Sequence, residues 1–419
     1  MAYTVTTLSG NSTLVGTSGA DQISSAGTAS KKIKVNAFEG LDTLTIDATV
    51  ASGTVGMGGG IDAVTVSAVA EDVSITLGDA ADTFTASAAA DGLTVGGQGG
   101  SDTFTFTAAV LNSRFSGGKG IDKFVSTTAD IGTKVTIVGG SENDVIGTSS
   151  ARFQTGTSAF INGQVGADSI FLDGTAGMTV HGGSEADTIN NSAAVSSCLL
   201  SGDNGADTIV DVAGVNTING GGGADTITAG AGADTITGGL GTDDFIMSDV
   251  VTAAAGITVD VITDFTVGSD DIGNYGVADI ETLTVVSDLV EAGNAASVAS
   301  GNFGAAVTKV TGAYDLGTSG TGSVLTLGSS TAFTTTTVAT ALKSGGDLEL
   351  TAGAAFGAAD GFIVFYDDNI DTYAAVVTTA GGVSDNAVSS DFVVTNLTKL
   401  KGLTDATTIT SADLLAFTA

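Results

Sequence analysis

The sequence lacks proline and tryptophan, and it has one cysteine, Cys198, and one histidine, His181, in 419 residues. A single cysteine excludes an intrachain disulfide framework. With one histidine and one cysteine, a zinc-protease site and Cys-His or Ser-His chemistry are excluded as well. We therefore expect Cys198 to be a buried apolar residue and His181 to form no zinc site alone.

Basic residues are scarce, with 12 Lys and Arg against 46 Asp and Glu, which gives a formal charge of −34. This balance argues against nucleic acid or an anionic membrane surface as a partner. No run approaches the roughly 20 apolar residues of a membrane span. The 42% hydrophobic content argues against disorder. Carboxylates without counter-charges repel one another, so the composition already implies a bound cation.

One pattern recurs thirteen times: a glycine-rich turn, then Asp, then an apolar residue two positions later. Successive Asp residues are 18 to 24 positions apart, and the last two spacings are nine. We call these residues the ladder aspartates: Asp21, Asp42, Asp62, Asp82, Asp102, Asp122, Asp144, Asp168, Asp187, Asp207, Asp225, Asp234 and Asp243.

Each ladder aspartate has fixed neighbours. The residues two positions after it and seven positions before it are always apolar, and glycine stands two positions before it except at Ala80, Glu142 and Glu185. Because alternate side chains of a strand face opposite sides, both strands flanking the turn point inward. The pattern predicts an all-β fold, a parallel β-roll or β-helix solenoid of about a dozen coils. Stacked interior strands also account for the absent proline, which has no N–H to donate.

The clearest copies are GGKGIDKF at 117–124, GGGGADTI at 220–227 and GGLGTDDF at 238–245. They resemble the G-G-x-G-x-D-x-U-x nonapeptide of the RTX (repeats-in-toxin) family. The resemblance implies a calcium-binding β-roll in which multiple Ca²⁺ ions lie between stacked turns, with the thirteen ladder aspartates as ligands. The second turn of most coils lacks the motif, so we expect one column of ions, becoming two near Asp225, Asp234 and Asp243.

Two further points concern the turns. Glu142 and Glu185 replace the usual glycine and are candidates for an additional ligand at their turns. The alternative for any single copy is an Asx-turn, in which the aspartate hydrogen-bonds its own backbone.

The chain divides in sequence into an N-terminal cap or lead-in (1–13), the roll (14–249) and a β-rich C-terminal domain (250–419). Residues 259–272 resemble the phrase that closes RTX rolls, residues 361–379 predict a hairpin, and a helix is expected within 332–343. The C-terminal end resembles that of RTX-type surface-layer proteins such as that of Caulobacter. That resemblance implies an uncleaved type I secretion signal, and the N-terminus lacks a classical signal peptide.

The leading hypothesis is a secreted, extracellular structural protein that self-assembles at the cell surface as an S-layer lattice or a filament. Its partners would be copies of itself, with cell-surface polysaccharide as another candidate, and calcium outside the cell would trigger folding. No residue constellation looks catalytic, so the prediction is that the protein is not an enzyme.

Two alternatives remain open. One is an adhesin or ice-binding module that uses the outward threonines directly after ladder aspartates. These threonines are Thr43, Thr83, Thr103, Thr188, Thr208, Thr226 and Thr235. The row is interrupted at Gln22, Ala63, Lys123, Val145 and Asp244. The other is a polysaccharide-modifying enzyme that uses the basic cluster Arg114, Lys119 and Lys123.

Overall fold

The computed structural model describes residues 3–5, 11–25, 32–127, 131–174, 177–194, 197–247, 259–273, 307–310, 314–315, 324–327, 332–342, 350–351, 361–379, 392–409 and 413–414. The chain forms two compact units, residues 1–212 and 213–419. The predicted boundaries at 13/14 and 249/250 stay predictions.

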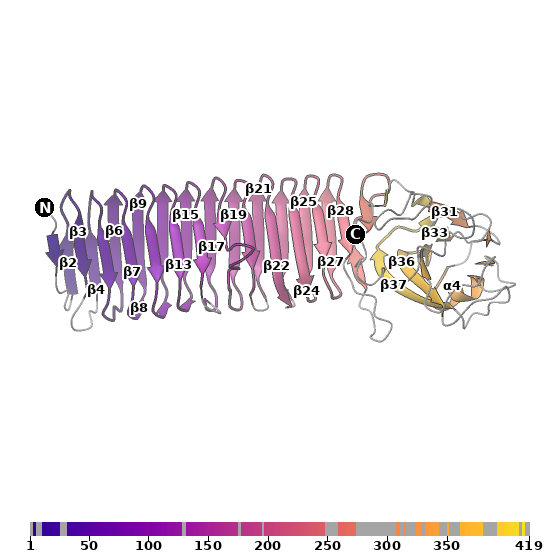
Figure 1. Cartoon of the computed structure of the whole chain (residues 1–419), viewed down its shortest axis with the longest axis horizontal. Helices are drawn as coiled ribbons and strands as arrows, with labels where there is room; N and C mark the ends of the chain where they lie inside the picture. Colours follow the sequence, from indigo (N-terminus) through magenta and orange to yellow (C-terminus); the bar gives the residue numbers. More distant parts are fainter. Residues whose placement is uncertain are drawn as a thin grey trace. The chain divides into compact units, whose positions relative to one another are not determined.

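The first unit is a parallel β-solenoid whose strands stack side by side (Figure 1). One sheet contains β1 (Tyr3–Val5), β3 (Asp21–Ser24), β5 (Thr43–Ile46), β7 (Ala63–Val66), β10 (Thr83–Ala86), β13 (Thr103–Phe106), β16 (Lys123–Ser126), β18 (Val145–Ile146), β20 (Ser169–Leu172) and β22 (Thr188–Ala194). The second sheet contains β2 (Asn11–Val15), β4 (Lys32–Asn36), β6 (Gly53–Gly59), β9 (Val73–Asp79), β12 (Thr94–Gly99), β15 (Arg114–Lys119), β17 (Thr136–Ser141), β19 (Phe160–Val165), β21 (Thr179–Ser184) and β23 (Leu199–Asn204).

Equivalent residues of successive coils pair directly, as Phe84 pairs with Phe104 and Phe104 with Phe124. This register repeats about every twenty residues, so the predicted solenoid is confirmed, with about 11 turns along the chain. Some coils also contain a third, two-residue strand that the sequence analysis did not expect. These strands are β8 (Ala70–Glu71), β11 (Ala90–Asp91) and β14 (Val110–Leu111), and they pair parallel to one another.

The interior of the first unit is filled by the apolar columns that flank the ladder. In its middle the side chains are phenylalanines without solvent exposure. Phe104 stacks on Phe124 with ring centroids 4.6 Å apart, and Phe106 meets Phe115 and Phe153 edge-on. Aromatic rings in these geometries add to the burial of apolar area, so each coil is stabilised by its neighbours rather than by itself.

Glycine two positions before the ladder aspartate is required by the backbone. Gly60 has φ +111°, and a Cβ there would lie 1.7 Å from the carbonyl oxygen of Gly40 in the preceding coil. The three exceptions keep the left-handed conformation, with φ 102° at Ala80 and φ 80° at both Glu142 and Glu185. Coil stacking therefore imposes this conformation even where the residue does not favour it.

The second unit continues with two groups of parallel strands. One group is β26 (Thr226–Ala229), β28 (Asp244–Met247) and β30 (Asp271–Gly273), and the other is β25 (Thr217–Gly222), β27 (Thr235–Leu240) and β29 (Asp260–Ile262). Strands β29 and β30 come from residues 259–272 and cover the last repeat strands, as that segment's resemblance implied.

The remainder of this unit is mixed: β36 pairs antiparallel with both its neighbours, whereas the other described strands pair parallel. The predicted hairpin is confirmed as β35 (Gly361–Asp367) and β36 (Thr372–Thr379), and the predicted helix is α4 (Thr335–Leu342). Strand β37 (Phe392–Leu400) pairs antiparallel with β36 and parallel with β29, which joins the hairpin to the repeat strands. Strands β31 (Val307–Val310) and β33 (Val324–Leu327) extend the sheet beyond β35, while β32 (Tyr314–Asp315) pairs with β34 (Leu350–Thr351). Within the described ranges, no helix is long and apolar enough to cross a membrane.

Candidate metal sites

The structure brings the ladder aspartates of the first unit into one continuous row. All of them are buried, with at most 2% of the residue exposed. The backbone N–H of each one from Asp21 to Asp187 donates to Oδ1 of the ladder aspartate in the next coil, at 2.6–2.7 Å. The Oδ1 bond thus runs between coils and not within a turn, which is unlike an Asx-turn. At Asp21 a bond within its own turn also forms, because Oδ2 accepts from the N–H of Thr17.

The other carboxylate oxygen has a different environment. Oδ2 is buried and accepts no hydrogen bond from the described residues in Asp42, Asp62, Asp82, Asp102, Asp122, Asp144, Asp168 and Asp187. A buried carboxylate oxygen without a partner is costly, because it has lost its water without replacement. Each of these carboxylates therefore has one oxygen whose charge no protein donor offsets.

A glycine five residues earlier leaves space beside this oxygen in some of the coils. At Gly97, a Cβ would lie 1.9 Å from Oδ2 of Asp102 and 2.4 Å from the carbonyl oxygen of Gly117 in the next coil. Two acceptor oxygens, one a carboxylate and one a carbonyl, thus face the same small space. We call this space the glycine cradle.

The cradle is present in some coils and filled in others. It recurs at Gly117, Gly139 and Gly163, where Oδ2 of the ladder aspartate lies 2.0–2.2 Å from the Cβ position and a carbonyl oxygen lies 2.6–2.7 Å from it. The corresponding residues before Asp42, Asp62 and Asp82 are Ala37, Met57 and Leu77, all fully buried. A side chain occupies the place that glycine leaves open, so these three coils have no cradle.

The oxygens of the cradle fit calcium. Calcium takes carboxylate and backbone carbonyl oxygens in flexible geometry, and these two types of oxygen face the cradle. Among the described residues, no three His, Cys, Asp or Glu side chains surround one point. A cation would therefore be held by one carboxylate per coil, from Asp102, Asp122, Asp144, Asp168 or Asp187, together with glycine carbonyls. A bound cation would supply the positive charge that these buried oxygens lack.

Burial raises the pKa of these carboxyl groups strongly. The pKa rises to about 7 at Asp102, Asp122 and Asp187 and to about 8 at Asp144. Desolvation is the largest cause, and neighbouring carboxylates raise the values further, whereas the hydrogen bond from the preceding aspartate opposes the shift. Without a cation, the folded row favours protonated carboxyls near neutral pH.

The second unit contains two columns, which matches the expected doubling near the end of the ladder. The N–H of Asp225 donates to Asp243 at 3.0 Å, and that of Asp243 donates to Asp270 at 3.2 Å. In the other column, Asn216 donates to Asp234 at 2.7 Å, and Asp234 donates to Asp260 at 2.8 Å. A cradle is present at Gly220, where the Cβ position is 2.4 Å from Oδ2 of Asp225 and 2.5 Å from the carbonyl oxygen of Gly238.

The sequence analysis missed Asp260 and Asp270 as members of these columns. Both stand two positions before an apolar residue, Ile262 and Ile272, and Gly268 stands two positions before Asp270. The sequence therefore contains the signal for both residues. It departs from the repeat in spacing, because Asp260 lies 26 residues after Asp234 and Asp270 lies 27 residues after Asp243.

The single residues and the two glutamates are placed as follows. Cys198 is buried and forms no disulfide, and burial raises the pKa of its thiol. His181 pairs through Nδ1 with Asp203 Oδ2 at 2.9 Å. The hydroxyl of Ser201 donates to Oδ1 of the same carboxylate at 2.6 Å, so this hydrogen bond does not form a Ser-His pair. Glu142 and Glu185 are exposed at their turns, and their role as ligands stays a prediction.

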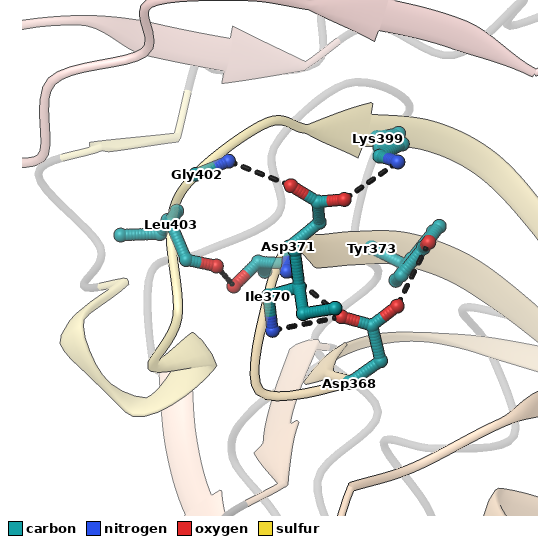
Figure 2. A network of polar contacts seen from close by, with 8 residues as sticks. Asp368, Ile370, Asp371, Tyr373, Lys399, Gly402 and Leu403 are labelled. Carbon is teal, nitrogen blue, oxygen red and sulfur yellow. Dashed lines mark hydrogen bonds and ion pairs between the residues drawn. The ribbon is translucent and has the colours of Figure 1, made fainter.

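The acidic turn of the C-terminal hairpin provides a contrast (Figure 2). Asp368 accepts from the N–H groups of Ile370 and Asp371 and from the hydroxyl of Tyr373. Asp371 accepts from the N–H of Gly402 at 2.7 Å and pairs with Lys399 at 2.5 Å. Burial alone would raise the pKa of Asp371, but the hydrogen bonds from Lys399 and Gly402 bring it below its usual value. Protein donors already bind both carboxylates. The turn therefore holds the hairpin against the segment after β37 and is not a cation site.

Three segments, residues 4–27, 201–236 and 210–245, match the family described as RTX calcium-binding nonapeptide repeat (4 copies). The chain carries RTX repeats. The RTX match covers both ends of the ladder, while the coils between residues 28 and 200 keep its geometry with fewer glycines. A comparison with the curated proteins finds no match for this chain. The repeats support calcium as the cation of the cradles, and the resemblance to surface-layer proteins is not tested by them.

The ladder aspartates have two roles: Oδ1 accepts the hydrogen bond from the neighbouring coil, and Oδ2 is the candidate cation ligand. Substitution of Asp102 tests whether the two roles are separate. An asparagine at this position keeps an oxygen that accepts from the N–H of Asp82 but removes the charge. We expect Asp102→Asn to stabilise the metal-free protein at pH 8, because a buried charge is lost, and to raise the calcium midpoint of folding severalfold. Circular dichroism during calcium titration measures both effects.

Asp82→Asn is the matched control, because it has the same ladder bond but Leu77 fills its cradle. It should likewise stabilise the metal-free protein, because it removes a buried charge, but it should not raise the calcium midpoint. Equal midpoints for the wild type and Asp102→Asn would contradict the assignment of a cation to the Gly97 cradle. Asp102→Ala should cost about 1–3 kcal/mol in addition, because it leaves the buried N–H of Asp82 without an acceptor.

The raised pKa values predict a pH dependence of the metal-free roll. An aspartate with an ordinary pKa of 3.8 that rises to about 6–8 on folding favours the folded state fully below pH 4. This stabilisation is lost as the pH rises through 6–8. Protein freed of metal by gel filtration should keep its β circular dichroism at pH 5, lose it at pH 8, and regain it when calcium is added. Unchanged β structure at pH 8 without calcium would show that the row needs no cation.

Proposed function

We propose that the protein is a secreted structural protein whose calcium-bound roll assembles at the cell surface, as a lattice or a filament. The observation that carries this proposal is the buried ladder itself. From Asp21 to Asp207 one hydrogen-bonded row runs between consecutive coils of the first unit. Such a repeated element suits a scaffold, since each coil supports the next.

A surface for self-association is supported by the residue directly before the ladder aspartate. Leu41, Ile61 and Ile121 are 62%, 59% and 54% exposed at the turn edge of the roll. Exposed large apolar side chains that recur along one edge are typical of a contact surface. They favour association of one roll with another copy along the ladder edge.

Secretion before folding completes the proposal. RTX repeat proteins are typically extracellular, and the raised pKa values disfavour a metal-free folded row at neutral pH. Calcium is scarce inside cells and abundant outside, so the chain would stay unfolded during export and fold after it. The secretion signal would lie in the C-terminal segment.

The protein would not act as an enzyme. Arg114 and Lys119 lie at opposite ends of β15, roughly 15 Å apart at the rise of an extended strand. This backbone spacing, together with the exposure of all three residues of the cluster Arg114, Lys119 and Lys123, gives no support for a polysaccharide-modifying site there.

Assembly is tested by negative-stain electron microscopy and light scattering of purified protein before and after calcium addition. We expect sheets or filaments with calcium and none in chelator. The triple variant Leu41→Ser, Ile61→Ser, Ile121→Ser should fold with calcium, as judged by circular dichroism, and assemble less. Monomers at every calcium and protein concentration would exclude the proposal while leaving calcium-dependent folding intact.

A second candidate function, binding of ice, is favoured by one observation. Thr45, Thr65, Thr85 and Thr105 pair in register on four consecutive coils, and the column ends at Val125. The sequence analysis had considered only the column beginning at Thr43, which is interrupted at Ala63 and Lys123. The side chains of the new column face outward and are half-buried. An in-register column of hydroxyl groups repeats at the spacing of adjacent strands, as the hydrogen-bonding groups of a regular lattice do.

Thermal hysteresis of the calcium-bound protein decides on this candidate. A measurable freezing gap that disappears in Thr65→Tyr, Thr85→Tyr would support ice binding. No gap in the wild type at millimolar concentration would exclude it.

A further inference from the structure

A cavity of about 430 Å³ opens on the first coils of the roll, away from the ladder. Its lining comes from adjacent strands of one sheet, β2, β4 and β6, together with Asp72 of the next coil. The lining residues are Thr13, Lys32, Ile33, Lys34, Ser52, Gly53, Thr54 and Asp72. This volume falls within the range of small-molecule sites.

The two lysines of this cavity are unusual for this chain. Lys32 and Lys34 are exposed, point to the same side of β4, and belong to a set of only 12 basic residues. Among the described residues, neither ammonium group lies within ion-pair distance of a carboxylate, although the chain contains 46 acidic residues. Two adjacent cations without carboxylate partners form a site for an anion.

The remaining lining indicates which kind of anion fits. Thr13 and Thr54 pair with Lys34 from the two neighbouring strands and place exposed hydroxyl groups on either side of it. The side chain of Ile33 is buried on the opposite face of β4 and belongs to the core. Asp72 contributes a carboxylate, which accepts hydrogen bonds from hydroxyl groups; its Oδ1 lies against Gly92 of the following coil.

We propose that this cavity binds an acidic saccharide, with a uronate carboxylate between Lys32 and Lys34 and sugar hydroxyls on Thr13, Thr54 and Asp72. The combination of cations and hydroxyl groups distinguishes this ligand from a bare inorganic anion, which would use the lysines alone. The inference concerns one molecule and does not depend on assembly.

Titration calorimetry of the calcium-bound protein in 0.15 M NaCl tests the proposal with three probes. Digalacturonate should bind, whereas maltose, the neutral disaccharide, and acetate, the carboxylate without a sugar, should bind at least tenfold more weakly. Lys32→Gln, Lys34→Gln should weaken digalacturonate binding about tenfold, the size expected for two exposed ion pairs. A short probe is used because long uronate chains gel with calcium.

The matched control is Lys119→Gln, Lys123→Gln, which removes the same charge from exposed sites several coils away. It should leave digalacturonate affinity unchanged, and circular dichroism should show both double variants folded. Three outcomes would overturn the proposal: no binding by the wild type, equal loss in both double variants, or acetate binding as tight as that of digalacturonate. Thr54→Val, which keeps both lysines, should weaken digalacturonate but not acetate.

Discussion

The structure depends on the stacking of one carboxylate per coil at the spacing of adjacent strands, about 4.8 Å. The same coil geometry that pairs Phe84 with Phe104 brings Asp82 next to Asp102. One oxygen of each carboxylate is satisfied by the N–H of its neighbour, which fixes the register of the turn. From Asp42 to Asp187 the second oxygen has no donor among the described residues, so the register that builds the roll also creates its requirement for positive charge.

The residue five positions before the ladder aspartate decides how each coil meets that requirement. Gly97 leaves a cradle in which a carboxylate and a carbonyl oxygen converge, whereas Met57 and Leu77 fill the same place with apolar side chains. Oδ2 of Asp62 and Asp82 is nevertheless buried without a hydrogen bond, as that of Asp102 is. The coils therefore share the requirement for positive charge and differ in whether glycine or an apolar side chain lies five positions before the aspartate.

The sequence was sufficient for the roll because its period assigns each residue a position in the coil. The inward columns, the left-handed turn glycine and the doubling of the column near Asp234 all follow from spacing. The glycine five positions before Asp102 is visible in the same spacing. Its role as part of a candidate cation site depends on the direction of Oδ2 of Asp102, which a pattern of residue types does not give. The third strand, exemplified by β8, was missed because Ala70 and Glu71 carry no alternation long enough to mark a strand.

The C-terminal strands were predictable only as local elements. The hairpin of β35 and β36 follows from two apolar runs around an Asp/Asn turn, whereas the pairing of β37 with β29 joins residues 138 positions apart, such as Val261 and Lys399. No local pattern in the sequence predicts a contact between segments so far apart. It nevertheless has a clear physical role, because β29 would otherwise present an unpaired edge. Its first residue, Asp260, accepts the ladder bond from Asp234, so the strand that receives the C-terminal sheet is itself positioned by the aspartate column. Within this unit, a continuous series of hydrogen-bonded contacts therefore links the aspartate column, through Asp260 and β29, to strand β37.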